Sequence, residues 1–305
     1  MNRFGSLECF VAVVEAGQFS AAAARLGLGK SVVSRRVSEL EEHLGARLLQ
    51  RTTRHLALTE AGRDFYPRAL QLLEDLAEAE QALSSGQQAL GGRIRLAAPL
   101  SFGLMHLTPA LNAFMVAHPG VVLDLDLDDS QVDLIREGVD LALRIGRLGD
   151  SSMVALPLAP IHFVIVASPA YLRRHGTPDS PEALGEHQGL CYSNLSEPNR
   201  WRLIDNRGKP HSITMTPRLL VNNGDLLLQA AIAGLGVGMT PTFNAYRALR
   251  EGQLVAILRD YRIDPVNAYA IYPSRRFVPQ RVRILVEFLR KRFGERPYWD
   301  EGIVS

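Results

Sequence analysis

The chain has little of what enzymes and secreted proteins usually depend on. Its 305 residues include only two cysteines, Cys9 and Cys191, which argues against a disulfide framework or a redox motif. The eight histidines are scattered without HExxH or other zinc-binding spacing, so no metal is expected. No serine lies in a GxSxG nucleophile turn. An enzyme is therefore the class of protein with the least support.

Long apolar runs are lacking as well. No stretch approaches the roughly 18 apolar residues of a membrane span. Glu8 and Glu15 interrupt the apolar N-terminus, unlike the core of a signal peptide. With 47% hydrophobic and 22% charged residues, the chain is expected to be soluble and cytoplasmic, without a membrane partner.

A nucleotide-binding loop is also missing. Residues 234–238 read Gly-Leu-Gly-Val-Gly, but this segment follows a predicted helix and enters a strand. A dinucleotide-binding loop runs in the opposite order, from a strand into a helix. Gly234 is better explained as the end cap of the helix, so no cofactor is expected.

The chain does contain a pattern of three short helices near its N-terminus. Apolar residues at helical spacing predict them over residues 7–16, 21–26 and 30–44. Gly17 ends the first helix, and Ser20 is suited to cap the second. Gly27-Leu28-Gly29 forms a tight turn before the third. Two helices around such a turn are typical of a helix-turn-helix motif.

The third helix has a polar face opposite its apolar stripe of Val33, Val37, Leu40 and Leu44. The hydroxyl and basic side chains are concentrated near its start: Lys30, Ser31, Ser34, Arg35, Arg36 and Ser38. Acidic residues are confined to its second half: Glu39, Glu41 and Glu42. A solvated surface helix is the alternative, but it more often mixes both signs of charge. A recognition helix in the DNA major groove keeps acids away from the phosphates, so we expect double-stranded DNA as a partner.

A small β-wing is predicted after the third helix. Arg54, Leu56 and Leu58 alternate as in a strand, and Arg51 and Arg54 are placed to meet DNA phosphates. Residues 1–68 hold ten basic and seven acidic residues, so their net charge is +3, whereas the remainder carries −1. This excess is modest, so specific contacts must supplement the attraction to phosphates.

These features together resemble the winged helix-turn-helix of LysR-type transcriptional regulators. The matching positions are Ala23, Leu26, Ser34, Val37, Leu40-Glu41, Leu44-Gly45, Leu48, Arg51 and Leu58-Thr59-Glu60-Ala61-Gly62. The sequence departs from the pattern at Gly29-Lys30, where Ser-Gln is common, and at Leu49, where Phe is common. The resemblance implies a regulator that binds an interrupted dyad operator, responds to a small-molecule effector and contacts RNA polymerase. Lys30 puts the operator sequence of relatives in doubt.

A long amphipathic helix is predicted from Thr59 to about Leu83, with Pro67 inside it as the site of a kink or an unpaired carbonyl. Its apolar seam is Phe65, Ala69, Leu72, Leu73, Leu76, Ala79 and Leu83. This seam packs either on the protein's own body or on a second subunit. The resemblance favours a homodimer or homotetramer, and a twofold protein suits a twofold DNA site.

The rest of the chain alternates between strand and helix patterns, which implies a parallel sheet with helices on its faces. The resemblance implies a two-lobed α/β effector domain of the periplasmic-binding-protein type. We therefore divide the chain into a DNA-binding domain (1–58), a linker helix (59–90) and an effector domain (91–305). Lobe I comprises 91–161 and 267–293, and lobe II comprises 162–266. The last dozen residues are expected to form a frayed tail.

Parallel sheets bind ligands at the carboxyl ends of their strands. The candidate effector contacts at such positions are Ser101, Phe102, Arg144, Tyr192, Ser193, Asn223, Thr240 and Pro241. For each of them, a capping or turn role is the alternative, and Asp225 is interpreted as an N-cap. The helix start at Ser101 and the charge of Arg144 suggest an organic acid as the effector. A cytoplasmic two-lobed carrier whose N-terminal region only dimerises is the competing function.

Overall fold

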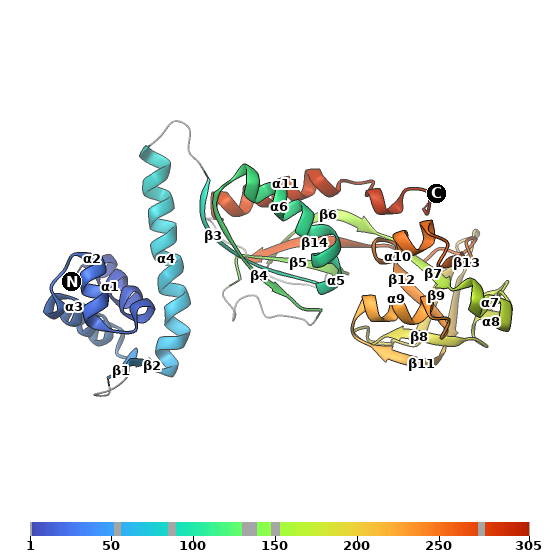
Figure 1. Cartoon of the computed structure of the whole chain (residues 1–305), viewed down its shortest axis with the longest axis horizontal. Coiled ribbons are helices and arrows are strands. Elements are labelled where there is room, and N and C mark those ends of the chain that lie inside the picture. The colour runs from blue at the N-terminus through green and yellow to red at the C-terminus, as the bar shows by residue number, and fades with distance from the viewer. Residues whose placement is uncertain are drawn as a thin grey trace. The chain divides into compact units, whose positions relative to one another are not determined.

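The computed structural model describes residues 2–51, 56–84, 90–129, 139–147, 153–273 and 278–304. The chain folds into two compact units, Met1–Ala89 and Leu90–Ser305 (Figure 1). Each unit has its own buried core, so each is described by itself.

The N-terminal unit begins with the three predicted helices, α1 (Arg3–Ala16), α2 (Phe19–Leu26) and α3 (Lys30–Leu44). Strands β1 (Leu49–Arg51) and β2 (Leu56–Leu58) pair antiparallel, which confirms the predicted wing. Ser20 was wrongly assigned as the cap of α2. The helix begins at Phe19, two residues before its predicted start, because Phe19 packs against the core, and Ser20 lies in its first turn.

Helix α4 (Glu60–Ser84) follows the wing and continues through Pro67. Gly62 lets α4 approach the wing, because a Cβ on this glycine would collide with the carbonyl oxygen of Leu48. The first part of the predicted seam packs on the N-terminal core through Phe65, Ala69 and Leu73. Leu72 remains 50% exposed, and the side chains of Ala79 and Leu83 lie outside the described residues. The seam is therefore divided between the protein's own body and a free surface.

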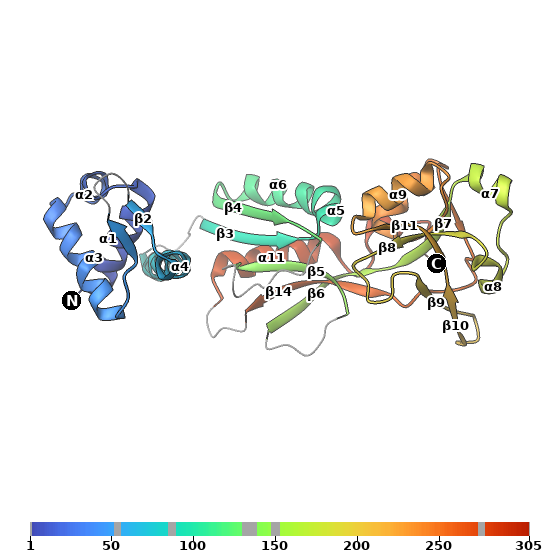
Figure 2. The ribbon, with the colours of Figure 1, turned by 90° about the horizontal axis from the view of Figure 1, so that it is seen from below.

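Lobe I of the C-terminal unit is built on a five-stranded sheet in the order β4-β3-β5-β14-β6. Its strands are β3 (Gly91–Ala98), β4 (Gly120–Leu127), β5 (Leu141–Gly146), β6 (Met153–Ile161) and β14 (Val266–Pro273). One face carries α6 (Thr108–Ala117) and α11 (Gln280–Phe293), whose side chains share a core with Ile94, Leu96 and Ala98 of β3. Figure 2 shows these helices beside the sheet.

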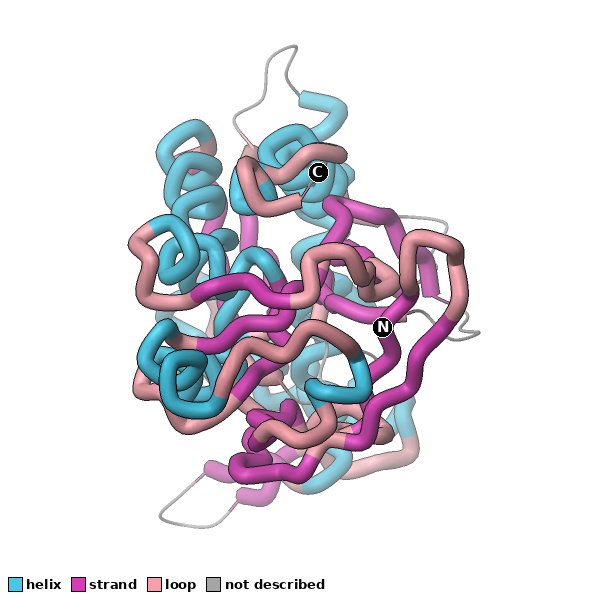
Figure 3. Tube along the Cα trace, turned by 90° about the vertical axis from the view of Figure 1, so that its right-hand side faces the viewer, coloured by secondary structure: helices cyan, strands magenta, loops and turns pink. Residues whose placement is uncertain are grey.

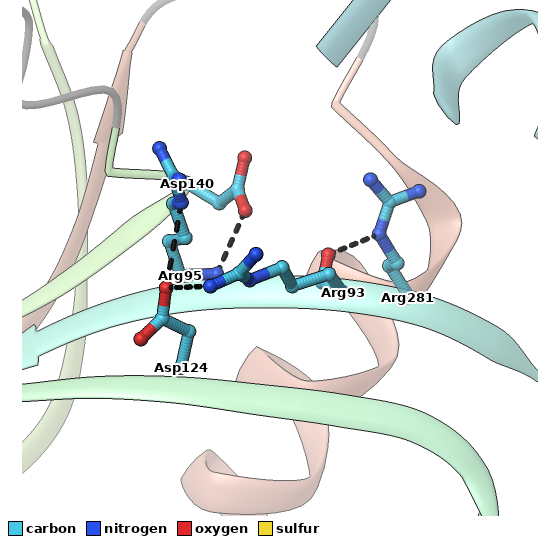
Figure 4. A network of polar contacts seen from close by, with 5 residues as sticks. All are labelled: Arg93, Arg95, Asp124, Asp140 and Arg281. Atoms are coloured by element: carbon cyan, nitrogen blue, oxygen red, sulfur yellow. Dashed lines mark hydrogen bonds and ion pairs between the residues drawn. The ribbon is translucent and has the colours of Figure 1, made fainter. Parts of the chain in front are cut away.

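Polar contacts also fix β3 within lobe I (Figure 4). The buried Arg281 of α11 donates from Nε to the carbonyl oxygen of Arg93 at 2.9 Å. Arg93 and Arg95 both contact the Asp124 carboxylate of β4, and the Asp140 carboxylate accepts from the backbone N–H of Arg95. The ion pairs are partly exposed and contribute little, whereas the Arg281 bond is sheltered and ties α11 to the sheet.

Lobe II contains a second sheet in the order β11-β8-β12-β7-β13. Figure 3 shows the protein with this lobe facing the viewer. Its strands are β7 (Phe163–Ala167), β8 (Gln188–Tyr192), β11 (Thr216–Val221), β12 (Val237–Pro241) and β13 (Val255–Ile257). A separate antiparallel hairpin is formed by β9 (Arg200–Ile204) and β10 (Pro210–Thr214). The helices are α7 (Pro169–His175), α8 (Pro181–Leu184), α9 (Gly224–Ile232) and α10 (Thr242–Arg250).

The expectation of parallel sheets was wrong. In each lobe, four strands run in the same direction and one opposes them: β14 runs antiparallel to β5 and β6, and β7 runs antiparallel to β12 and β13. The crossing between lobes explains this mixture: the chain leaves lobe I through β6, enters lobe II through β7 and returns through β14. The strand predicted at 161–167 is two strands separated by His162. The helix predicted at 129–137 lies almost entirely outside the described residues.

One helical stretch, Leu100–Ala117, is 18 residues long with a mean hydropathy of 1.3, so the expectation that no such run exists was wrong. It comprises α5 (Leu100–Phe102), a π-helical segment (Gly103–Leu107) and α6. Its length and composition would allow it to cross a membrane. However, Phe102, Leu107, Leu111 and Phe114 are buried in the core of lobe I, as expected for a core helix of a globular domain.

The C-terminal tail is not frayed, contrary to expectation. A 3₁₀ turn at Tyr298–Asp300 follows α11, and the Trp299 side chain is fully buried. Its ring packs against Phe102, His106 and Phe293 of lobe I. Burial of one tryptophan offsets the ordering of a short tail, because an aromatic side chain removes a large apolar area from water.

Candidate DNA-binding face and effector cleft

Helix α3 presents the predicted polar face. Lys30, Ser31, Arg35 and Ser38 are exposed, and Ser34 is half-buried, while Val33, Val37 and Leu40 point into the core. The Arg35 side chain is 71% exposed, and its Nε lies 3.7 Å from Glu39 Oε1 one helical turn on. Such exposed ion pairs contribute little to stability, so Arg35 can exchange this partner for DNA at low cost.

Arg36 lies elsewhere. It is half-buried between α3 and α1, and its Nη1 is 4.0 Å from the Cys9 sulfur. The same nitrogen is 3.0 Å from the position that a Cβ on Gly5 would occupy, so the guanidinium covers the glycine of α1. Burial raises the pKa of the Cys9 thiol, and the Arg36 hydrogen bond opposes this shift. The structure therefore brings Arg36 to the contact between two helices and not to the face that holds Arg35.

Glu41 positions the wing against α3, a role that sequence reasoning missed. Its carboxylate is buried, and Oε1 accepts hydrogen bonds from the backbone N–H groups of Leu48 (2.8 Å) and Leu49 (3.0 Å). These bonds satisfy two donors at the start of β1 and fix the recognition helix relative to the wing. The backbone of Arg51 ends β1 opposite Leu56, whereas the Arg51 side chain and all of Arg54 lie outside the described residues.

A cleft of about 450 Å³ lies between the lobes of the C-terminal unit. On the side of lobe I it is lined by residues of β3, β5 and β14 and by the two residues that follow β4, and on the side of lobe II by the end of β8 and the loop after it. The lining residues that carry polar or aromatic groups are Asp128, Asp129, Arg144, Arg147, Tyr192, Asn194 and Tyr269. Of the predicted contacts, only Arg144 and Tyr192 belong to this lining.

The start of α5 is already occupied by the protein's own carboxylate. Asp129 Oδ1 accepts a hydrogen bond from the Leu100 N–H at 3.0 Å. Burial raises the pKa of the Asp129 carboxyl, and the hydrogen bonds from Leu100 and Asn223 oppose that shift. Because this helix N-terminus already donates to Asp129, it has less to offer an effector anion, and the helix start at Ser101 no longer supports an anionic effector.

Ser101 and Asn223 serve structural roles at two helix starts. The buried Ser101 hydroxyl donates to Asp225 Oδ2 at 2.9 Å. Asn223 caps α9, because its Oδ1 accepts from the Leu226 N–H at 3.0 Å. The interpretation of Asp225 as the N-cap was therefore wrong: the cap is two residues earlier, and Asp225 joins lobe II to lobe I through Ser101.

The remaining predicted contacts lie away from the cleft lining. Phe102 is fully buried among Phe243, Phe293 and Trp299. Thr240 is buried on β12, Pro241 ends that strand, and Ser193 is exposed beyond β8. Among the residues described, the Thr240 hydroxyl has no hydrogen-bond partner.

Asn194 connects the two walls of the cleft. Its Nδ2 donates to the Asp129 carbonyl oxygen of lobe I at 3.0 Å and to the Tyr192 hydroxyl at 3.3 Å. Burial, followed by the nearby Asp129 carboxylate, raises the pKa of Tyr192, which keeps this phenol protonated. Sequence reasoning missed Asp128, Asp129, Arg147 and Tyr269. The two aspartates follow strand β4 directly, and that position was a usable signal.

A winged helix-turn-helix joined to a two-lobed domain with a ligand-sized cleft defines a ligand-responsive DNA-binding regulator. The family comparisons agree with this class. Residues 4–63 match the bacterial regulatory helix-turn-helix protein, lysR family, and residues 87–294 match the LysR substrate binding domain. The chain belongs to the LysR family of transcriptional regulators, and the predicted fold class is confirmed.

Individual relatives cover nearly the whole chain. An uncharacterised HTH-type transcriptional regulator of Haemophilus influenzae is 36% identical over 92% of this chain and 98% of its own length. The regulator CrgA of Neisseria meningitidis serogroup C is 36% identical over 94% and 96%. A solved structure of CrgA from Neisseria meningitidis has a TM-score of 0.61 at 35% identity and covers 94% of this chain and 97% of that one.

The full-length structure of AphB, a virulence activator of Vibrio cholerae, has a TM-score of 0.59 at 30% identity, covering 93% and 97%. These proteins are regulators and not enzymes. The chain is accordingly a DNA-binding transcriptional regulator with a small-molecule effector domain, and the carrier alternative finds no support.

Proposed function

We propose that the regulator acts as a cytoplasmic homodimer or homotetramer that binds an interrupted inverted repeat and contacts RNA polymerase. Residues 1–58 read DNA, 59–90 pair subunits, and 91–305 bind the effector. The observation that carries the DNA assignment is the row of exposed hydroxyl and basic side chains on α3, opposite Val33, Val37 and Leu40, which are buried in the core. An exposed Leu72 on α4 supports pairing through this helix.

In this proposal, the side chains of α3 that enter the major groove are Lys30, Ser31, Ser34, Arg35 and Ser38. The DNA phosphates are contacted by Arg51 and Arg54. Arg36 was also predicted to contact DNA. In this proposal its contribution to DNA binding is indirect, because its guanidinium lies against α1.

Arg35→Ala provides the test of base reading. If Arg35 grips a guanine, the variant loses about 1–3 kcal/mol of binding to the operator and keeps its affinity for unrelated DNA. Arg25→Ala is the matched control, since Arg25 is an exposed arginine of α2 that pairs with Glu15. Fluorescence anisotropy with operator and scrambled DNA measures both. An equal loss of affinity for the two DNAs would make Arg35 a phosphate contact.

The effector proposed for the cleft is an organic acid. Arg144 and Arg147 supply positive charge to the lining, and Tyr192 and Tyr269 supply aromatic surface for the body of the ligand. Calorimetry with a panel of organic acids is expected to give heat with wild type and a weaker response with Arg144→Gln. Heat only from neutral or cationic compounds would overturn the assignment to an acid.

The effector acts by shifting the population of lobe arrangements. A ligand in the cleft changes this equilibrium only if it binds one arrangement more tightly than the other. The hydrogen bonds that already cross between lobes, from Asn194 to Asp129 and from Ser101 to Asp225, define the arrangement that an effector must favour or disrupt. The changed arrangement alters the spacing of the two recognition helices in the dimer.

A further inference from the structure

The C-terminal tail lies across the place where the chain crosses between the lobes. His162 is the single residue between β6 of lobe I and β7 of lobe II, and its carbonyl oxygen accepts a hydrogen bond from the Thr242 N–H at 2.9 Å. Thr242 begins α10, which packs on both lobes: Phe243 and Tyr246 belong to the core of lobe I, and Ala245 and Ala248 belong to that of lobe II. This junction is where a change in lobe angle must be absorbed.

Asp300 of the tail binds both parts of this junction. One carboxylate oxygen accepts from Thr242 Oγ1 at 2.5 Å, and the other accepts from His162 Nδ1 at 2.8 Å. Asp300 and Thr242 are buried, so the bond between them is shielded from water, whereas the bond to His162 is partly exposed. The tail thus holds the crossing point through both carboxylate oxygens of one side chain.

Two further contacts anchor the tail on either side of Asp300. Trp299 is inserted into the core of lobe I, where its ring centre is 4.6 Å from that of His106. At the other end of α10, Arg250 Nη2 donates to the carbonyl oxygens of Tyr298 and Glu301, both at 3.3 Å. The helix α11 that precedes the tail belongs to lobe I, and Arg250 follows Ala248 of α10, which packs on lobe II. The tail therefore connects the lobes in addition to the two chain crossings, which lie between β6 and β7 and between β13 and β14.

We infer that residues 295–304 form a strap that holds the angle between the lobes through Asp300. In this account, the strap sets the resting lobe equilibrium on which an effector acts, and this consequence rests on the proposed function. Release of the Asp300 contacts removes a restraint on the crossing point and leaves the cleft lining intact. The population of the minor lobe arrangement then rises by about tenfold or more.

The lobe equilibrium can be measured without DNA or effector. Spin labels at Arg290→Cys on α11 and Glu182→Cys on α8, both exposed, report one distance between the lobes by double electron–electron resonance. Cys9 and Cys191 are buried, and protein without the added cysteines gives the labelling background. Dilution with unlabelled protein restricts the signal to distances within one subunit.

Asp300→Ala is expected to broaden or shift the distance distribution, and Glu295→Gln, which changes an exposed carboxylate at the start of the same tail, is expected to leave it as in wild type. If Asp300→Ala does not fold, Asp300→Asn keeps the shape of the side chain and gives the same test. An unchanged distribution in a folded Asp300 variant, or an equal change in Glu295→Gln, would overturn the strap. Since neither DNA nor effector is present, failure here is distinct from failure of the proposed function.

Discussion

His106 should make the C-terminal unit sensitive to mild acid. The side chain is buried beside Trp299, with Nε2 3.1 Å from the Phe243 carbonyl oxygen and Nδ1 2.6 Å from the Tyr298 hydroxyl. A carbonyl can only accept, so the hydrogen lies on Nε2, and Nδ1 accepts from the tyrosine. Protonation of Nδ1 would remove this lone pair. Burial lowers the pKa of His106 from 6.5 to about 4, against the opposing effect of the Phe243 hydrogen bond.

The sign and size of the effect follow from linkage. The folded state binds this proton less tightly than the unfolded state, so the stabilisation is complete above the unfolded pKa and falls as the pH drops below it. Between pH 8 and pH 5, a pKa of about 4 in the folded state costs about 2 kcal/mol of unfolding free energy, and the loss levels off near 3 kcal/mol below pH 4. His187, whose pKa is also lowered by burial, adds to the loss in the same direction.

The assay is urea unfolding at several pH values, followed by the fluorescence of Trp299 in a Trp201→Phe background. The chain has two tryptophans, so this background reports on the surroundings of His106 alone. His106→Phe is expected to lower the stability at pH 8, because two hydrogen bonds are lost, but to remove about 2 kcal/mol of the pH dependence. His43→Gln, at an exposed position of α3, is the control. A pH dependence in His106→Phe equal to that of wild type would refute the reasoning.

Three further predictions concern the N-terminal unit. Glu41→Ala leaves two buried N–H donors without an acceptor and should lower the unfolding free energy by about 3 kcal/mol in thermal or urea unfolding. Glu42→Ala, at an exposed position, should change stability by less than about 0.5 kcal/mol, and equal losses in the two variants would contradict the role of Glu41. Gly62→Ala forces a Cβ against the Leu48 carbonyl oxygen and should lower the unfolding free energy by more than about 3 kcal/mol in the same assay. The control Ala61→Gly should lower it by roughly 1 kcal/mol, and a similar loss in both variants would show that the close approach is unimportant. Leu72→Glu should dissociate subunits in analytical ultracentrifugation while Arg68→Glu does not, and an intact oligomer in Leu72→Glu would place the subunit contact elsewhere.

The N-terminal unit could be predicted closely because local patterns determine it. Val33, Val37 and Leu40 recur at helical spacing, and glycines with left-handed backbone end α1 and α2, so the bounds of α3 were predicted to the residue. The position of Arg36 could not be predicted in the same way. The helical period shows only that Arg36 lies beside the apolar stripe of α3. Its guanidinium packs against α1 because the neighbouring residue of that helix is the small Gly5.

The effector cleft was predicted less well, since it depends on contacts between residues far apart in the chain. Asn223, and not Asp225, caps α9, because the Asp225 carboxylate is held by Ser101, 124 residues earlier. The sequence of the polar tail by itself predicts disorder. The tail is ordered because Trp299 enters a cavity, and three separate segments of the chain form that cavity. Arg144 and Tyr192 were predicted to line the cleft because each lies at the end of a strand, and both do. The same criterion, applied to the end of β4, would also have identified Asp128 and Asp129.

The central claim is that this regulator recognises specific DNA sites through α3. Purified protein should be incubated with sheared genomic DNA of its source at moderate salt, and the retained fragments sequenced, with Arg35→Ala as the control. Wild type is predicted to enrich a few intergenic fragments that share an interrupted inverted repeat, and the control is predicted to lose this enrichment. Retention of the same fragments by both proteins, or no shared repeat among the retained fragments, would contradict the account.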